Sequence, residues 1–283
     1  MDGSVTDLGR LGPLVPKAKG DVAQAVAEDG LMLRVLVGST VHGTAILGQD
    51  DRDEMGICVE PPETVTGLRG FKHYQYRTQP EGVCSGPGDL DLIVYSLRRY
   101  AGLAASGNPT VLLPLFVPED AVCYSNQFGA ELRQLRAMFL SKQCGERFKG
   151  YLHSQREGLM GLRSGGTRNQ GRQDIRARYG FDTKFATHMV RLGLQGVELL
   201  SSGEITLPMR GEDLAWLREL RHGERSREEA LTRAEELESE ITNLIGTSRL
   251  PERPAYAAID SWLDSVHRRH WGWAGRVMDL GEE

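Results

Sequence analysis

Two acidic residues one position apart, at the start of an apolar segment, most constrain how this chain can fold. Asp51 and Asp53 precede the apolar residues 55–59, and an earlier apolar segment, 31–37, ends at Gly38-Ser39. Because side chains alternate between the faces of a strand, Asp51 and Asp53 are expected to project from the same face. Carboxylates held this close repel each other unless a cation lies between them. The pattern therefore predicts a divalent metal site, and the backbone N–H groups and hydroxyl of the Gly-Ser pair are suited to hold a phosphate beside it.

A third carboxylate is expected from a later strand. Residues 89–95 alternate in polarity and place Asp89 and Asp91 on one face, so either could join the first two acids. Asp91 is the better candidate, because it lies deeper in the apolar segment, where a lone charge is costly to bury without a metal ion or a partner. Carboxylate oxygens suit Mg²⁺ or Mn²⁺. Two such ions about 3.5–4 Å apart can hold the attacking and leaving oxygens of a phosphoryl displacement.

The apolar periodicity changes along the chain. Residues 21–28 are expected to form a short helix with Asp21 as its N-cap, and residues 63–87 to form short elements and loops over the site. From residue 96, apolar residues recur at helical spacing, first up to the break at 107–109. Further helices are expected at 131–139, 144–162, 182–201, 213–222, 228–245 and 255–270. The fold class is therefore α+β: a small mixed β-sheet with flanking helices, followed by a mostly helical domain.

We expect a lead-in at 1–20, a domain that carries the acids at 21–125, and a helical domain at 126–283 that completes the cleft. A net charge of −5 argues against a protein that coats nucleic acid by bulk electrostatics, although a local basic patch can still bind it. The four cysteines are scattered without CxxC spacing, which suits reduced thiols in the cytosol. No segment resembles a signal peptide or approaches the ~18 apolar residues of a membrane span, so we expect a soluble, cytoplasmic protein without a membrane partner.

The segments 37–44 (VGSTVHGT) and 50–57 (DDRDEMGI) resemble the Gly-Ser…Asp-x-Asp signature of the DNA polymerase β-like nucleotidyltransferase superfamily. The closer likeness is to its branch of predicted nucleotidyltransferases from bacteria and phages, some of which are associated with RNA repair. The likeness extends through 91–97, 107–109 and 182–192. The signature often has Arg and Tyr where this chain has Thr40 and His42, and Ser where Asp50 stands. We interpret these departures as affecting the substrate and not the chemistry, because the metal-ligand positions are kept.

The resemblance implies a role for each of these residues. Gly38 and Ser39 would hold a nucleoside triphosphate, Asp51 and Asp53 would ligate both metal ions, and Asp91 would complete the metal site and help activate the acceptor hydroxyl. A nucleoside monophosphate would be joined to the acceptor and pyrophosphate released, with Mg²⁺ or Mn²⁺ as cofactor. The acceptor stays open between an RNA end, a protein hydroxyl and a small molecule.

Two basic segments are candidates for binding anions. In the helix expected at 182–192, Lys184, His188 and Arg191 lie at positions i, i+4 and i+7 and share one face, which predicts contact with the triphosphate or the acceptor. The alternative is a solvated basic face with apolar residues packed behind it. The second segment, Arg163 to Arg178, is either an arm that contacts a nucleic-acid backbone or the triphosphate, or a solvated loop.

Three functions remain compatible with the sequence. The first is a metal-dependent nucleotidyltransferase. The second is a toxin-like nucleotidyltransferase that modifies one protein or tRNA. The third is a sensor that binds a nucleotide without turnover, which three retained acids make less favourable, because a binder has no need of a carboxylate placed against an acceptor.

Overall fold

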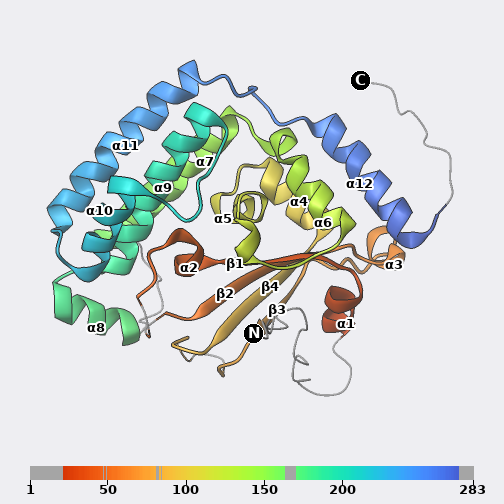
Figure 1. Ribbon diagram of the computed structural model, residues 1–283, viewed down its shortest axis with the longest axis horizontal. Helices are drawn as coiled ribbons and strands as arrows, with labels where there is room; N and C mark the ends of the chain where they lie inside the picture. Colours follow the sequence, from red (N-terminus) through yellow and green to blue (C-terminus); the bar gives the residue numbers. More distant parts are fainter. Residues whose placement is uncertain are drawn as a thin grey trace, which may run out of the picture.

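The computed structural model describes residues 22–46, 48, 50–80, 83, 85–162 and 170–273, with the backbone alone at 170–174. Within these residues, five strands form one mixed sheet in the order β3-β4-β2-β1-β5 (Figure 1). The strands are β1 (Leu31–Val37), β2 (Arg52–Cys58), β3 (His73–Arg77), β4 (Leu90–Ser96) and β5 (Val122–Ser125). β2 pairs in parallel with β4, and the other strand pairs are antiparallel.

The three long strands confirm the segments predicted from alternation, with shifts of a few residues at their ends. β1 has the predicted bounds, β4 is shifted by one residue, and β2 begins at Arg52, before the apolar segment 55–59. The two edge strands were not predicted. β3 lies inside the segment 63–87 that was expected to form short elements and loops, and β5 has only four residues. Runs this short carry little periodic signal, and pairing with β4 and β1 fixes them instead.

The two faces of the sheet are covered differently. On one face, alternate residues such as Met55 and Ile57 join a large core that includes Tyr100 of α4 (Leu97–Ala105) and Phe148 of α7 (Lys142–Leu159). On the other face, α1 (Val22–Asp29) covers a smaller cluster around Cys58, Leu92 and Val94 of the sheet. The predicted helix at 21–28 is confirmed as α1, and its predicted N-cap Asp21 lies outside the described residues. Because β2 lies in the middle of the sheet, the acids at its start are held by a strand buried on both sides.

Four helices pack against one another beside the sheet, at the left of Figure 1. They are α7, α9 (Thr183–Ser202), α10 (Gly211–His222) and α11 (Arg227–Thr247), and each confirms a predicted helix to within a few residues at its ends. The fifth helix at this end, α8 (Gln170–Tyr179), corrects the expectation of an arm or loop at Arg163–Arg178. Residues 163–169 of that segment lie outside the described part of the chain. Arg176 and Arg178 are exposed on α8.

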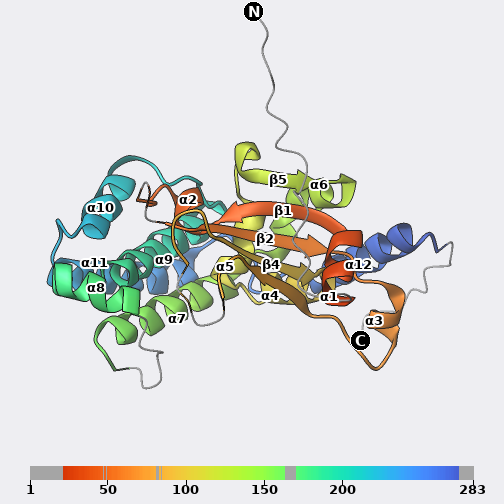
Figure 2. The ribbon, with the colours of Figure 1, turned by 90° about the horizontal axis from the view of Figure 1, so that it is seen from below.

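The C-terminal helix returns to the sheet half of the molecule. Figures 1 and 2 both place α12 (Tyr256–Trp271) at the opposite end from α8, α10 and α11. The Trp262 indole is buried and donates to Glu131 of α6 (Gln127–Gln134) at 3.0 Å. The helix predicted at 131–139 is wrong in its bounds: α6 ends at Gln134 and a 3₁₀ turn, η3 (Arg136–Phe139), follows.

Several short helices connect the longer elements. They are α2 (Gly38–His42), α3 (Pro62–Thr66), α5 (Pro109–Leu112), η1 (Leu113–Leu115) and η2 (Glu119–Ala121). None of the described helices has both the length and the apolar character needed to cross a bilayer. Among these connections, α2 matters most for the site, because it leads directly from β1 into the segment that precedes β2.

Candidate active site

A cleft of about 720 Å³ lies between the sheet and α9. One wall is made by β2, β3, β4 and α2, and the other by α9, with contributions from α5, α7 and α10. The predicted site residues that line it are Gly38, Ser39, Asp53, Asp91, Lys184, His188 and Arg191. The remaining predicted residue, Asp51, reaches the same site through its carboxylate.

The three predicted acids converge. Among the described residues, Asp51, Asp53 and Asp91 each offer a carboxylate oxygen that lies within 4.8 Å of the other two. Asp53 of β2 is the direct neighbour of Asp91 in the parallel strand β4, so both side chains lie on the same face of the sheet. Asp51 precedes Asp53 by two positions and therefore projects to that face as well. This spacing allows the three carboxylates to share a divalent ion.

The surroundings of Asp53 disfavour the ionised form of its carboxyl group. Burial, together with the negative charges of Asp51 and Asp91, raises the pKa of the Asp53 carboxyl to about 6. No hydrogen-bond donor among the described residues contacts the carboxylate of Asp51 or Asp53, although the charge of Lys184 lowers the pKa of Asp53 in part. The pair of carboxylates therefore lacks a sufficient counter-charge from the described part of the protein.

Gly38 lies directly against the Asp53 carboxylate. The last residue of β1, Val37, pairs with Asp53, so the chain must turn past that side chain as it leaves the strand. Gly38 has a φ of 72°, and a Cβ at this position would be 2.1 Å from Asp53 Oδ2. Glycine is therefore required here both by the left-handed backbone and by the close approach of the Asp53 carboxylate.

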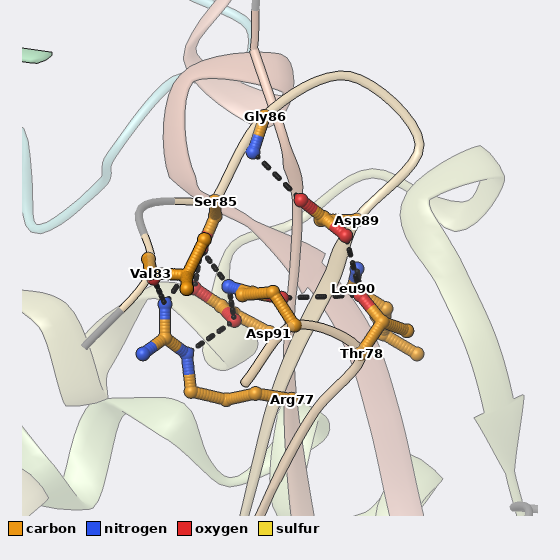
Figure 3. A network of polar contacts seen from close by, with 9 residues as sticks. Arg77, Thr78, Val83, Ser85, Gly86, Asp89, Leu90 and Asp91 are labelled. Carbon is orange, nitrogen blue, oxygen red and sulfur yellow. Dashed lines mark hydrogen bonds and ion pairs between the residues drawn. The ribbon is translucent and has the colours of Figure 1, made fainter. Parts of the chain in front are cut away.

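Asp91 is held by three donors, in contrast to the other two acids. Arg77 Nε and Gln79 Nε2 donate to Asp91 Oδ1 at 2.9 and 3.0 Å, and Ser85 Oγ donates to Oδ2 at 2.7 Å. Figure 3 shows this network at the start of β4. Burial by itself raises the pKa of Asp91, but the hydrogen bonds from Ser85, Arg77 and Gln79 outweigh it, and the pKa lies below its ordinary value.

The alternative third acid, Asp89, serves a different purpose. Its Oδ1 accepts from Thr78 Oγ1 at 2.8 Å and its Oδ2 accepts from the Gly86 N–H at 2.9 Å (Figure 3). These bonds tie together the two ends of the connection between β3 and β4. The group of three acids contains Asp91 and not Asp89.

The helical wall of the cleft carries cations. Asp182 caps α9 by accepting from the Phe185 N–H at 3.0 Å, and this cap fixes where the helix begins. Lys184 is exposed, and its Nζ lies 3.8 Å from Asp50 Oδ1. Arg191 makes no hydrogen bond or ion pair with the described residues, and burial lowers the pKa of its guanidinium to about 10. A partly buried cation in this position is available to an anion that enters the cleft.

Two histidines lie beside Arg191. Burial, followed by the charge of Arg191, lowers the pKa of His188 to about 3. His42 is buried, and burial, Arg191 and His188 lower its pKa well below the ordinary value. Its Nδ1 contacts Gln195 Nε2 at 3.3 Å, while its Nε2 is buried without a partner in the described part of the chain. Both rings are therefore neutral near pH 7, and they add hydrogen-bonding groups to the cleft without adding charge.

Asp50, which stands where the family signature has Ser, connects the two walls. Its side chain is 5% exposed, and its Oδ1 lies 3.1 Å from Arg221 Nη2 on α10. Its Oδ2 accepts from the Ile46 N–H at 2.6 Å. The contact with Arg221 anchors Asp50, the residue next to Asp51, to the helical half of the molecule.

The donor set fits a divalent cation. The three groups that converge are carboxylates, the hard oxygen ligands that Mg²⁺ and Mn²⁺ prefer. Burial and the nearby charges of Asp51 and Asp91 both raise the pKa of Asp53. An ion between these oxygens would remove the repulsion between these charges.

The arrangement of strands, acids and Gly-Ser turn defines the class of site that the sequence signature predicted, that of a DNA polymerase β-like nucleotidyltransferase. Residues 17–265 match the family described as RlaP, the RNA repair pathway DNA polymerase beta family. The match spans most of the chain, and the protein therefore belongs to this family.

One solved structure that resembles the chain is a nucleotidyltransferase-like protein from Exiguobacterium sibiricum 255-15. The two chains are 10% identical, with 87% of this chain and 77% of that chain covered, and the TM-score is 0.29. A search of curated proteins gave no match.

Sequence reasoning missed the residues that support Asp91. Arg77, Gln79 and Ser85 lie in or after β3, within the segment 63–87, where no strand was recognised. The alternation of Tyr74 and Tyr76 with polar neighbours was the available signal, but it spans too few residues to stand out.

Proposed function

We propose that this protein is a metal-dependent nucleotidyltransferase. It would transfer a nucleoside monophosphate from a nucleoside triphosphate to a hydroxyl acceptor and release pyrophosphate. The observation that carries this proposal is the convergence of Asp51, Asp53 and Asp91 opposite a wall on which Arg191 has no ion-pair partner among the described residues. Acids alone would suit many metal sites, whereas acids facing an arginine across one cleft suit a metal-bound polyphosphate.

The residues of the cleft would have different roles in binding the substrates. Gly38 and Ser39 would contact the triphosphate, Lys184 would neutralise phosphate as a point charge, and Arg191 would clamp it through two N–H groups. His188 would donate or orient a hydrogen bond. The acceptor hydroxyl would approach from the side of Asp91.

Divalent ions held by Asp51, Asp53 and Asp91 would polarise the phosphoryl oxygens and favour the ionised form of the acceptor hydroxyl. The protein itself would align the acceptor, the α-phosphate and the leaving pyrophosphate, because the two walls would hold the nucleotide from opposite sides. Walls that enclose the reacting groups also exclude water, which would otherwise compete as the acceptor.

We propose an RNA end as the acceptor, because the family is described by its place in an RNA repair pathway. The exposed Arg176 and Arg178 on α8 are consistent with contact to a phosphate backbone. The toxin-like alternative differs only in the acceptor, and the sensor alternative keeps nucleotide binding without turnover.

The test is to incubate the protein with Mn²⁺ or Mg²⁺, RNA with free 3′-hydroxyl ends, and each of the four nucleoside triphosphates labelled at either the α- or the γ-phosphate. We expect label from the α-phosphate, and none from the γ-phosphate, to become attached to RNA, and Asp91→Ala to abolish the transfer. Label on a protein from added lysate, or on tRNA alone, would favour the toxin-like alternative. Nucleotide binding without pyrophosphate release would favour the sensor, and γ-label on RNA would contradict a nucleotidyltransferase.

A further inference from the structure

The three acids of the site are not supported equally. Asp91 accepts three hydrogen bonds from side chains, whereas Asp51 and Asp53 accept none from the described residues. Two of the three donors, Gln79 and Ser85, also contact each other. The bonds come from β3 and the connection that follows it, and none comes from the strand that carries Asp91 itself (Figure 3).

Arg77 is the centre of this network. Besides the bond from its Nε to Asp91 Oδ1, its Nη2 donates to Ser85 Oγ at 2.8 Å and to the Val83 carbonyl oxygen at 3.4 Å. One guanidinium therefore fixes both the carboxylate and the segment that supplies its second donor. The planar group makes these contacts at once only in one orientation.

The hydrogen bonds also determine which lone pairs of Asp91 remain available. An ionised carboxylate has about four acceptor positions, two on each oxygen. Arg77 and Gln79 occupy both positions on Oδ1, and Ser85 occupies one on Oδ2. One position on Oδ2 remains, which suits a ligand that binds a cation through a single oxygen.

We propose that Arg77 is a positioning residue for the metal site: together with Gln79 and Ser85 it holds Asp91 in the one orientation in which Oδ2 can ligate a cation shared with Asp51 and Asp53. This inference rests on the proposed function insofar as that function requires the metal. It assigns to Arg77, Gln79 and Ser85 the role of orienting Asp91, which neither the fold nor the presence of the three acids implies.

Removing Arg77 should change the cation affinity in two opposite ways, through the loss of its charge and through the loss of its hydrogen bonds to Asp91 and Ser85. Arg77 is a positive charge near a cation site, so its loss by itself should strengthen cation binding. The side chain is 43% exposed, however, and exposed charge pairs are screened by water. Loss of a partner that orients a metal ligand typically weakens metal binding by roughly 10- to 100-fold. Positioning should therefore dominate, and weaker binding could not result from the loss of charge.

The experiment measures Mn²⁺ binding to the full chain without nucleotide, by the electron paramagnetic resonance signal of free Mn²⁺. We expect Arg77→Ala to bind Mn²⁺ at least about 10-fold more weakly than the unmodified protein, and Ser85→Ala about 3-fold more weakly. Arg77→Lys retains the charge but cannot make the same set of bonds, so it should restore only part of the affinity. Arg136→Ala is the matched control, because Arg136 is 39% exposed and pairs with Glu204 away from the cleft.

The outcomes separate this inference from the proposed function. If the unmodified protein binds no Mn²⁺, both are overturned. If it binds Mn²⁺ and Arg77→Ala binds it equally well or more tightly, the positioning role alone is overturned. Circular dichroism of each variant shows whether it is folded, and should Arg77→Ala fail to fold, the Ser85→Ala result decides: unchanged affinity would overturn the proposal.

Discussion

The sheet wall and the helical wall of the cleft carry opposite charges. On each wall, some of the charged side chains have no partner of opposite charge among the described residues of that same wall. On the sheet wall, Asp51 and Asp53 lie together without a hydrogen-bond donor among the described residues. On the helical wall, Arg191 has neither an ion pair nor a hydrogen bond with them. Direct pairing of these groups would cancel their charges, but the contact between the walls is made by Asp50 and Arg221 instead, and no ion pair joins Arg191 to Asp51 or Asp53. The uncompensated charge on each side is what a metal-bound triphosphate would satisfy, through its cations on one side and its phosphates on the other.

The largest effect is expected from neutralising the sheet wall. Asp53→Asn removes a proposed metal ligand, and because metal ions supply several kcal/mol of transition-state stabilisation, nucleotidyl transfer should fall by about 10³-fold or more. The same change should stabilise the metal-free protein. The raised pKa of Asp53 means that stability is lost as the pH rises through about 6, and the amide avoids that loss.

The gain in the free energy of unfolding at pH 7.5 should be about 1–2 kcal/mol, after allowance for the partial exposure of the carboxyl group. Urea unfolding of metal-free protein at pH 7.5 and pH 4.5 measures it, and the gain should shrink at the lower pH. Loss of both activity and stability would contradict the view that Asp53 is strained for function.

The close approach of Gly38 to Asp53 can be tested with a matched pair of glycines. Gly38→Ala should displace the carboxylate and reduce transfer by roughly 100-fold, because small misplacements at a reacting centre cost about this much. Gly48 has a similar φ of 74°, but a Cβ there meets no described residue within 4 Å. Gly48→Ala therefore carries the backbone strain alone, and its steady-state transfer rate should stay near that of the unmodified protein. Equal losses in both variants would show that strain, and not contact with Asp53, explains the glycine.

On the helical wall, Arg191→Met should weaken binding of the nucleoside triphosphate by roughly 10- to 100-fold, since hydrogen bonds to charged groups contribute about 1.5–3 kcal/mol. Isothermal titration with a non-hydrolysable triphosphate measures this directly. Arg227→Met, on the exposed surface of α11, provides the control and should leave the affinity unchanged. An unchanged affinity in the Arg191 variant would remove the anion-binding role of this wall.

The smallest expected effect is on the pH dependence of folding stability, through the neutral side chain of His188. In the folded protein the pKa of His188 is about 3, so below its unfolded value near 6.5 the unfolded chain binds more protons than the folded one. Stability should therefore fall as the pH decreases below 6.5, by at most about 1.4 kcal/mol per pH unit for this residue, and stay independent of His188 above it.

Urea unfolding at pH 7.5 and 5.5 should show a smaller loss in His188→Gln than in the unmodified protein. His73→Gln, at an exposed position, should lose as much stability as the unmodified protein. Identical pH dependence in all three proteins would contradict the burial of a neutral His188.

The parts of the site that the sequence predicts are those whose signal is local. Asp51 and Asp53 are two positions apart, and Lys184, His188 and Arg191 follow one helical face, so secondary-structure periodicity alone places them. The choice of Asp91 over Asp89 required the argument that a buried charge needs a partner. In the structure Asp91 lies with Asp51 and Asp53, whereas the oxygens of Asp89 bond to Thr78 and Gly86.

The parts that the sequence did not predict depend on contacts between distant segments. β3 and β5 are too short to show a period, and their places are set by pairing with β4 and β1. Arg77 reaches Asp91 only because β3 lies beside β4, and Asp50 reaches Arg221 across 171 positions of the chain. α8 was missed because its basic, Gly-containing sequence has no apolar stripe. Long-range partners of this kind cannot be read from spacing.

Anomalous diffraction at the manganese edge, from crystals grown with Mn²⁺ and a non-hydrolysable nucleoside triphosphate, tests whether the three acids share a metal ion. We expect an anomalous peak within coordination distance, about 2.0–2.3 Å, of carboxylate oxygens from Asp51, Asp53 and Asp91, with phosphate oxygens between that peak and Arg191. Manganese bound elsewhere, or a triphosphate bound without metal contact to these three acids, would contradict this expectation.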